Sequence, residues 1–152
     1  MVELKFEADI RASADRVFSL LADLRDYDRW LPPSSAFHGT VLIADGPIVV
    51  GTTYVEPGLL GTRYGTVTAL DRPRRLGFEQ PMTLKLRALG VIGIELLHTL
   101  APNGPSVHLV RTLALSPRGP VKFAMPFVVR MFRIENERML RTLKTYAEAN
   151  PA

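Results

Sequence analysis

Hydrophobic and charged residues alternate without interruption at the start of the chain. Val2, Leu4, Phe6, Ala8 and Ile10 share one parity, and the positions from 3 to 9 between them are charged. A period of two predicts a β-strand with one buried and one solvated face, which is typical of an antiparallel sheet. The same charges predict that this segment is not a secretory signal peptide, because such a peptide needs an unbroken apolar stretch.

The hydrophobic period then becomes helical, and it does so again near the C-terminus. Ser13 is expected to cap a short helix, and a second helical turn is expected at residues 26–31, before Pro32. After residue 117, a stripe of apolar residues at helical spacing predicts a long helix at residues 121–148, with a break near Pro126 left open.

Six segments between these helices have the pattern of strands. They are residues 37–44, 52–56, 62–70, 76–80, 84–100 and 107–115, and Gly, Pro, Asn and Asp separate most of them. Residues 84–100 are too many for one flat strand, so Gly90 and Gly93 are expected to mark a bend or bulge. The order of elements predicts a single α+β domain at residues 1–152. In it, a curved antiparallel sheet of about seven strands wraps around the C-terminal helix.

Composition narrows the possible functions. The chain has 152 residues and no cysteine, which excludes disulfides, thiolate metal sites and cysteine nucleophiles. Its net charge of +4 is spread without a run of five like charges, so no nucleic-acid partner is expected. The longest apolar stretch, residues 89–97, is shorter than a membrane span, so no stable membrane insertion is expected. We expect a cytoplasmic protein that is a monomer or homodimer.

No motif for nucleophilic catalysis or nucleotide binding occurs in the sequence. Gly-x-Ser-x-Gly, His-Glu-x-x-His, the P-loop and the dinucleotide glycine pattern are all missing. The three histidines, His38, His98 and His108, lack the spacing of metal ligands. We therefore expect neither a metal nor a cofactor.

Several short motifs in this order resemble one known family. They include Ile10-Arg-Ala-Ser-Ala-Asp-Arg-Val-Phe18, Tyr27-Asp-Arg-Trp-Leu-Pro32, Gly65-Thr-Val67 and Asp71-Arg-Pro-Arg-Arg-Leu76. Together they resemble the START-like (SRPBCC) superfamily, in particular its polyketide cyclase/dehydrase-like branch, over essentially the whole chain. The resemblance implies a helix-grip fold with a deep, mostly apolar pocket between the sheet and the C-terminal helix. It implies binding of lipids, polyketides or similar molecules, and it transfers no catalytic residue.

Two polar residues stand on strand faces that are otherwise apolar. His98 shares its parity with Ile94, Leu96 and Leu100, so it is expected to point inward. It could hold a ligand carbonyl or transfer protons, but a core histidine bonded within the protein is the interpretation we favour. Arg111 is the one charge on its strand face. It could bind an anionic group, pair with a buried carboxylate, or extend to solvent, and we slightly favour the carboxylate pair.

Other polar and aromatic residues are weaker candidates for ligand binding. Asn136 falls on the buried stripe of the last helix, where an amide needs partners. Tyr54 and Tyr64 could place a hydroxyl at the pocket edge or simply pack. Trp30, just before Pro32, is expected to pack against the sheet, with a place at the pocket mouth as the alternative.

Five apolar residues are candidates for the pocket lining: Phe78, Phe127, Val128, Met131 and Phe132. Core packing is the default interpretation for each of them. Residues 56–62 could form a lid over the entrance or an ordinary hairpin loop.

Three functions follow from these observations. The favoured one is binding of a hydrophobic small molecule in an internal cavity. The first alternative is a cyclase/aromatase or dehydratase that acts on a polyketide-like substrate by general acid–base chemistry. The second is docking of the basic outer face of the last helix, including Arg130, Arg133 and Lys144, to an acidic surface.

Overall fold

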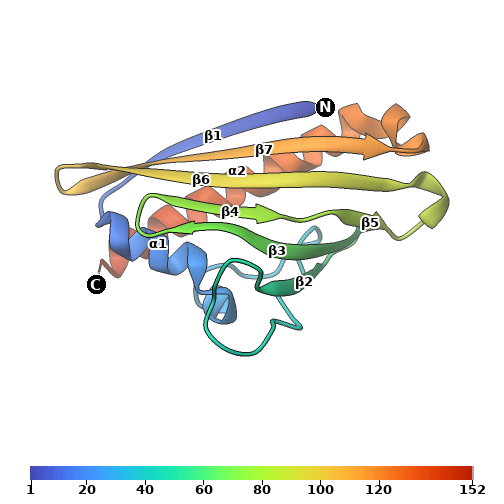
Figure 1. Ribbon diagram of the computed structural model, residues 1–152. Coiled ribbons are helices and arrows are strands. Elements are labelled where there is room, and N and C mark those ends of the chain that lie inside the picture. Colours follow the sequence, from blue (N-terminus) through green and yellow to red (C-terminus); the bar gives the residue numbers. More distant parts are fainter. Residues whose placement is uncertain (152) are drawn as a thin grey trace.

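Seven antiparallel strands form one sheet in the computed structural model, which describes residues 1–151 (Figure 1). The strands are β1 (Val2–Ile10), β2 (Thr53–Pro57), β3 (Gly61–Asp71), β4 (Arg75–Glu79), β5 (Met82–Leu84), β6 (Val91–Asn103) and β7 (Ser106–Arg118). Their order in the sheet is β1-β7-β6-β4-β3-β2, and the short β5 pairs with both β3 and β6. Ala152, the last residue of the predicted domain, lies outside the described residues.

Helical segments follow β1 and β7, and one short helix lies between β5 and β6. They are α1 (Ala14–Ala22), α2 (Met125–Ala149) and the 3₁₀ helices η1 (Leu24–Arg29), η2 (Arg87–Leu89) and η3 (Pro120–Ala124). The predicted cap is confirmed, because the Ser13 hydroxyl accepts the backbone N–H of Arg16. Pro126 lies in the first turn of α2, where a backbone N–H would have no acceptor within the helix, so the proline costs no hydrogen bond. Within residues 1–151, no helix is long and apolar enough to cross a membrane.

The core lies between one face of the sheet and the helices α1 and α2, as Figure 1 shows. Alternation along β6 and β7 decides which side chains enter it. Ile94, Leu96, His98 and Leu100 are buried, while Glu95 and Thr99, which have the opposite parity, are exposed. The predicted helix-grip architecture and the inward parity of His98 are therefore confirmed.

One of the predicted strands is wrong, and a second is divided at a bend that was expected. Residues 37–44 form only a single bridge, from Val41 to Val55, because Gly39 and Leu42 adopt left-handed backbone that interrupts an extended chain. Residues 84–100 divide into the end of β5, the helix η2 and most of β6. Gly90 makes this bend with a φ of 103°, which fits the predicted role of glycine there.

Candidate functional site

A buried polar cluster joins the centre of the sheet to α2. His98 on β6 and Arg111 on β7 are direct cross-strand partners. The Nη1 of Arg111 lies 2.6 Å from the Nε2 of His98, and its Nε donates to the Oδ1 of Asn136 at 2.6 Å. Asn136 in turn donates through Nδ2 to the main-chain carbonyl of Phe132 at 2.7 Å. His98 and Asn136 are 13 and 25 positions from Arg111 in the sequence, and together they hold its guanidinium group in place.

Hydrogen-bond chemistry assigns the charges in this cluster. A guanidinium can only donate, so the Nε2 of His98 must accept and the imidazole is neutral. Burial holds the pKa of His98 well below its ordinary value, and the nearby Arg111 cation lowers it further. Burial also lowers the pKa of Arg111 to about 10, so its guanidinium stays charged at neutral pH.

Arg111 has no carboxylate partner. Within residues 1–151, no acidic oxygen lies within 4.0 Å of its guanidinium, and the structure assigns its Nη2 no hydrogen bond. Glu56 and Glu135, which line the same cavity, pair instead with Arg63 and Arg138. The favoured prediction of a buried carboxylate pair is therefore wrong, and burial of the side chain also excludes extension to solvent. The cation is held by neutral groups alone.

A second polar cluster occupies the opposite wall of the interior. Gln80 donates through Nε2 to the hydroxyl oxygen of Tyr54 at 2.5 Å and, at 3.3 Å, to Glu56. The Glu56 carboxylate also accepts the Thr40 hydroxyl at 2.7 Å and lies 3.6 Å from the Nη2 of Arg63. Burial, with the Glu56 charge nearby, raises the pKa of Tyr54, so its phenol remains protonated.

Sequence analysis missed Glu56 and Gln80, although strand parity contained the signal for both. Tyr54 and Glu56 are two positions apart on β2, and Gln80 continues the inward parity of Phe78. If Tyr54 points inward on a regular strand, then Glu56, two positions later, must point inward too. Tyr27 was also missed, and it lines the cavity with its hydroxyl donating to the carbonyl of Leu21.

Glu135 fastens the segment before β2 to α2. Its Oε1 accepts the Ser34 hydroxyl at 3.0 Å and the Nη2 of Arg138 at 2.5 Å. Arg138 also donates to the carbonyl of Pro32 at 3.0 Å. Burial alone would raise the pKa of Glu135, but the hydrogen bonds from Arg138 and Ser34 outweigh it and lower this pKa. Glu135 is thus held ionised beside, but not bound to, Arg111.

The cavity between these clusters is small. It measures about 50 Å³ and is lined by Leu31, Phe37, Phe78, Leu96, Met139 and the polar groups described above. A neighbouring cavity of about 30 Å³ shares Arg63, Glu135 and Asn136 with it. Ligand pockets usually measure roughly 300–1,000 Å³, and one water occupies roughly 30 Å³. The structure of residues 1–151 therefore does not contain the expected deep, mostly apolar pocket between the sheet and α2.

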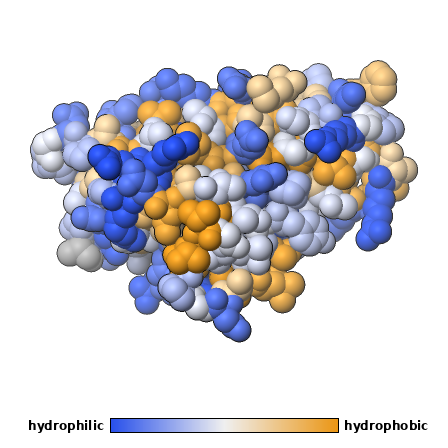
Figure 2. All heavy atoms as spheres, viewed as in Figure 1, coloured by the Kyte–Doolittle hydropathy of each residue, from blue (hydrophilic) through white to orange (hydrophobic). Residues whose placement is uncertain are grey.

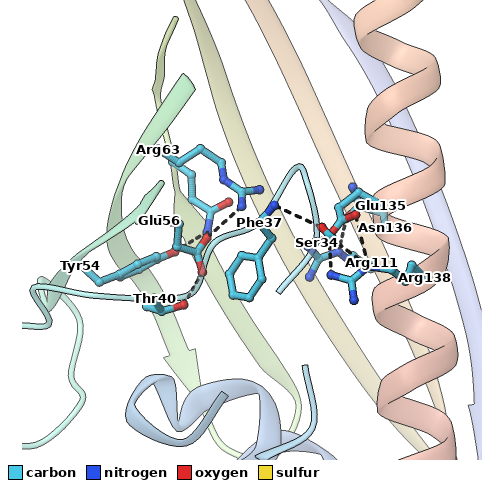
Figure 3. Close-up of polar contacts among 11 residues, drawn as sticks. Ser34, Phe37, Thr40, Tyr54, Glu56, Arg63, Arg111, Glu135, Asn136 and Arg138 are labelled. Carbon is cyan, nitrogen blue, oxygen red and sulfur yellow. Dashed lines mark hydrogen bonds and ion pairs between the residues drawn. The ribbon is translucent and has the colours of Figure 1, made fainter. Parts of the chain in front are cut away.

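Phe37 fills much of the space that such a pocket would occupy. Its side chain is buried, although residues 31–52 around it contain no regular strand or helix. Figure 3 shows the ring between the Glu56 cluster and the group formed by Ser34, Glu135 and Arg111. Ser34 holds this position through two hydrogen bonds. The N–H of Phe37 donates to the Ser34 hydroxyl oxygen, and the N–H of Ser34 donates to the Phe37 carbonyl.

Larger hollows lie outside this interior. One of about 730 Å³ is open to solvent and includes Glu3, Lys5, Glu79 and Glu95 among its lining. These side chains belong to the outward parity of their strands, and the hollow holds no buried, unpaired polar group. The small interior cavity is therefore the stronger candidate for a binding site.

The structure brings six of the predicted site residues to the two cavities. His98, Arg111, Asn136 and Phe78 line the first, and Asn136, Met131 and Phe132 line the second. Tyr54 lies just behind the lining and contacts it through Gln80. Trp30 is buried away from both cavities, where its ring packs edge-on against Tyr27 at 5.4 Å.

Tyr64 does not reach either cavity, so the predicted place at the pocket edge is wrong, and Phe127 and Val128 do not belong to the lining of either cavity. Tyr64 is 52% exposed because it has the outward parity of β3, between Arg63 and Gly65. Phe127 is 62% exposed because it lies one position, or about 100° of helix rotation, from the buried stripe that contains Val128.

Comparison with known proteins places this geometry in context. Residues 1–148 match the model of a family described as polyketide cyclase / dehydrase and lipid transport. No curated protein matches the chain. Among solved structures, protein CV1439 from Chromobacterium violaceum superposes with a TM-score of 0.70 and 16% identity, covering 96% of both chains.

Two further structures share the fold. Norcoclaurine synthase from Thalictrum flavum, in complex with dopamine and hydroxybenzaldehyde, has a TM-score of 0.72 and 15% identity, covering 99% of this chain and 88% of its own. Ara h 8.0201 has a TM-score of 0.69 and 12% identity, covering 98% and 99%. At such identities the likeness concerns the fold alone.

Proposed function

Because the chain belongs to the polyketide cyclase/dehydrase and lipid-transport family, we propose that it binds a small hydrophobic molecule with one acidic or carbonyl oxygen. The oxygen accepts from Arg111, and the carbon skeleton lies between the sheet and α2. One observation carries this proposal: Arg111 is buried and charged, and it has no carboxylate partner in the described chain.

Electrostatics gives the physical reason. A buried cation without a counter-ion is costly, and neutral hydrogen bonds compensate only part of its lost hydration. A ligand carboxylate, phenolate or polarised carbonyl would supply the missing acceptor in a site where water is scarce. His98 and Asn136 occupy two of the guanidinium nitrogens and leave Nη2 for this oxygen.

The hydrophobic part of the ligand requires more space than the cavities contain. Phe37 is the side chain whose displacement would provide it, because it lies in the cavity on a segment without regular structure. Met131 and Met139 line the two cavities from α2, and flexible methionine side chains adapt readily to different shapes. Binding is thus expected to exchange protein side-chain contacts for ligand contacts.

Calorimetric titration tests the proposal, with small aromatic carboxylic acids as ligands and the matching alcohols as controls. The wild-type chain should bind at least one acid, and Arg111→Met should weaken it about 10- to 100-fold, as expected for a lost charged hydrogen bond of about 1.5–3 kcal/mol. Arg75→Met removes an exposed arginine on β4 and serves as the matched control. Equal binding of acids and alcohols, or binding that survives Arg111→Met, would contradict the proposed role of the cation.

Proton transfer on a bound carbonyl compound is the second candidate. Its support is that a neutral imidazole, His98, and a buried carboxylate, Glu56, line the same cavity. If the protein catalyses such a step, Glu56→Gln or His98→Gln should lower the turnover number of a candidate substrate much more than its affinity. Substrate binding without any turnover would exclude this catalytic role and support binding as the function.

A further inference from the structure

One end of the molecule exposes an unusual number of large hydrophobic side chains. Phe123 on η3 is 92% exposed and Phe127 on α2 is 62% exposed. Leu86 and Leu89, before and within η2, and Leu59, in the turn between β2 and β3, are exposed as well. These five residues together are called the apolar end below.

Backbone contacts show that these segments are neighbours although they are distant in sequence. The N–H of Lys85 donates to the carbonyl of Leu60, which brings the η2 segment to the β2–β3 turn. Gly90 packs so tightly on the carbonyl of Arg118 that a Cβ would come within 1.9 Å of its oxygen. In Figure 1, η2 and the start of α2 lie at the same end, where Figure 2 shows hydrophobic and strongly hydrophilic side chains side by side.

The charges around the apolar end have one sign. Residues 57–63, 81–93 and 116–132 contain no aspartate or glutamate. Five exposed basic residues lie in these segments: Lys85, Arg87, Arg118, Lys122 and Arg130. In the described chain none of the five lies within 4.0 Å of a carboxylate. Of the exposed basic residues elsewhere, Lys5, Arg72 and Lys144 have acidic partners, whereas Arg75 and Arg141 have none among residues 1–151.

This distribution differs from the basic helix face considered in the sequence analysis. Farther along α2, Glu135 pairs with Arg138, and near the C-terminal end of the helix Lys144 pairs with Glu148. The start of the helix has no acidic residue in its first turn and no side-chain cap, and Lys122 comes just before it. A cation near a helix N-terminus opposes the helix dipole, so this arrangement is poor for the stability of the free protein.

We propose that the apolar end docks on a membrane surface that carries anionic phospholipids. Phe123 and Phe127 enter the boundary between headgroups and acyl chains, where aromatic rings are favourable. The five basic residues around them face lipid phosphates, and each cation near such a surface contributes attraction. A nucleic acid fits less well, because the exposed leucines can neither stack on bases nor pair with a phosphate backbone.

The cavity of about 30 Å³ connects this surface with the proposed ligand site. Leu60, Met82 and Met131 line it, so it opens beside the apolar end. A hydrophobic ligand could therefore pass between the membrane and the interior without crossing water. This route rests on the proposed binding function, whereas docking to the membrane does not.

Sedimentation of the full chain with lipid vesicles tests the docking. We expect binding to phosphatidylcholine vesicles that contain phosphatidylglycerol, weaker binding at high salt, and no binding to phosphatidylcholine alone. Lys122→Glu should weaken binding at least about fivefold, since one surface cation is removed and one anion added. Phe123→Asp should weaken it further, and neither change disturbs the core because both side chains are exposed.

Matched controls lie elsewhere on the surface. Leu42→Asp alters another exposed leucine, and Arg75→Glu reverses a charge at the start of β4; both should bind vesicles like the wild type. Absence of binding to the anionic vesicles, or equal binding by Lys122→Glu, would overturn the proposal. Binding of duplex RNA but not vesicles, sensitive to Lys122→Glu, would overturn it in favour of a nucleic-acid surface. The calorimetric titration with Arg111→Met reports on the ligand site separately.

Discussion

Arg111 and His98 face each other across β7 and β6, and the Nη1 of Arg111 lies 2.6 Å from the Nε2 of His98. A permanent cation and a titratable ring thus share one buried hydrogen bond. Protonation of His98 would break this bond and place two positive charges side by side. The pair therefore couples the charge state of the interior to the integrity of the site.

The first prediction concerns the titration of His98. Its pKa lies well below the ordinary value of about 6.5, so its NMR signals should stay constant over about pH 5–8, where an ordinary histidine titrates. His108 is the internal control. It is exposed and bonded to Asp9 and Glu7, which raise its pKa, so its signals should move in this range.

The same shift has a consequence for stability. Below about pH 6.5 the unfolded chain binds a proton at residue 98 and the native chain does not, so the free energy of unfolding falls as the pH falls. Urea unfolding at several pH values should show this loss to be smaller in His98→Gln than in the wild type. Parallel curves for the two proteins would contradict the assigned neutral state.

The second prediction separates binding from stability at the polar cluster. Replacing the cluster with apolar residues, in the triple variant Arg111→Met, His98→Leu and Asn136→Leu, removes a buried charge together with the groups that solvate it. Such replacements are often neutral or stabilising by about 1–4 kcal/mol. Urea unfolding should therefore find the triple variant at least as stable as the wild type, while calorimetry finds no binding of acidic ligands. A strongly destabilised triple variant would indicate that the cluster serves the fold.

The third prediction concerns the support of Tyr54. The ring of Tyr54 lies directly over Gly65 on the neighbouring strand, and a Cβ at position 65 would come within 2.1 Å of its Cζ. Gly65→Ala should therefore reduce the free energy of unfolding by about 1–3 kcal/mol through overpacking. Gly93→Ala is the matched control, because its nearest contact would be an ordinary 3.5 Å.

A double variant checks the cause of this effect. In Tyr54→Ala the ring is gone, so adding Gly65→Ala should cost much less than it does in the wild type. The difference measures the coupling between the two residues. Equal costs in both backgrounds would mean that strand geometry, rather than the ring, requires the glycine.

The fourth prediction concerns Phe37. Phe37→Ala should open the interior cavity and reduce the free energy of unfolding by about 3–5 kcal/mol. Benzene should then raise the melting temperature of this variant but not that of the wild type, because it has the size of the phenyl ring that is removed and would contact Leu31, Phe78 and Leu96 in the lining. Phe18→Ala, a fully buried phenylalanine of α1 that lines neither cavity, is the matched control for simple loss of packing. If benzene has no effect on Phe37→Ala, the segment collapses into the space instead.

The helix-grip architecture and the inward direction of the central polar residues were both predictable from the amino-acid sequence. His98 and Arg111 could be placed because strand parity is a local property, which depends only on neighbours two positions away. Asn136 could be placed for the same reason, since the helical stripe repeats every three or four residues. The wrong strand at residues 37–44 shows the limit of this logic, because alternation cannot reveal whether a segment finds a partner.

The surroundings of these residues depend on how the whole chain packs. The neutral partners of Arg111, the position of Phe37 and the small volume of the cavity all depend on segments that are distant in the chain. Parity states that a side chain points inward, but the volume left for a ligand is the difference between the space enclosed and all the side chains that fill it. That difference is set by packing among every element at once, and no local pattern encodes it.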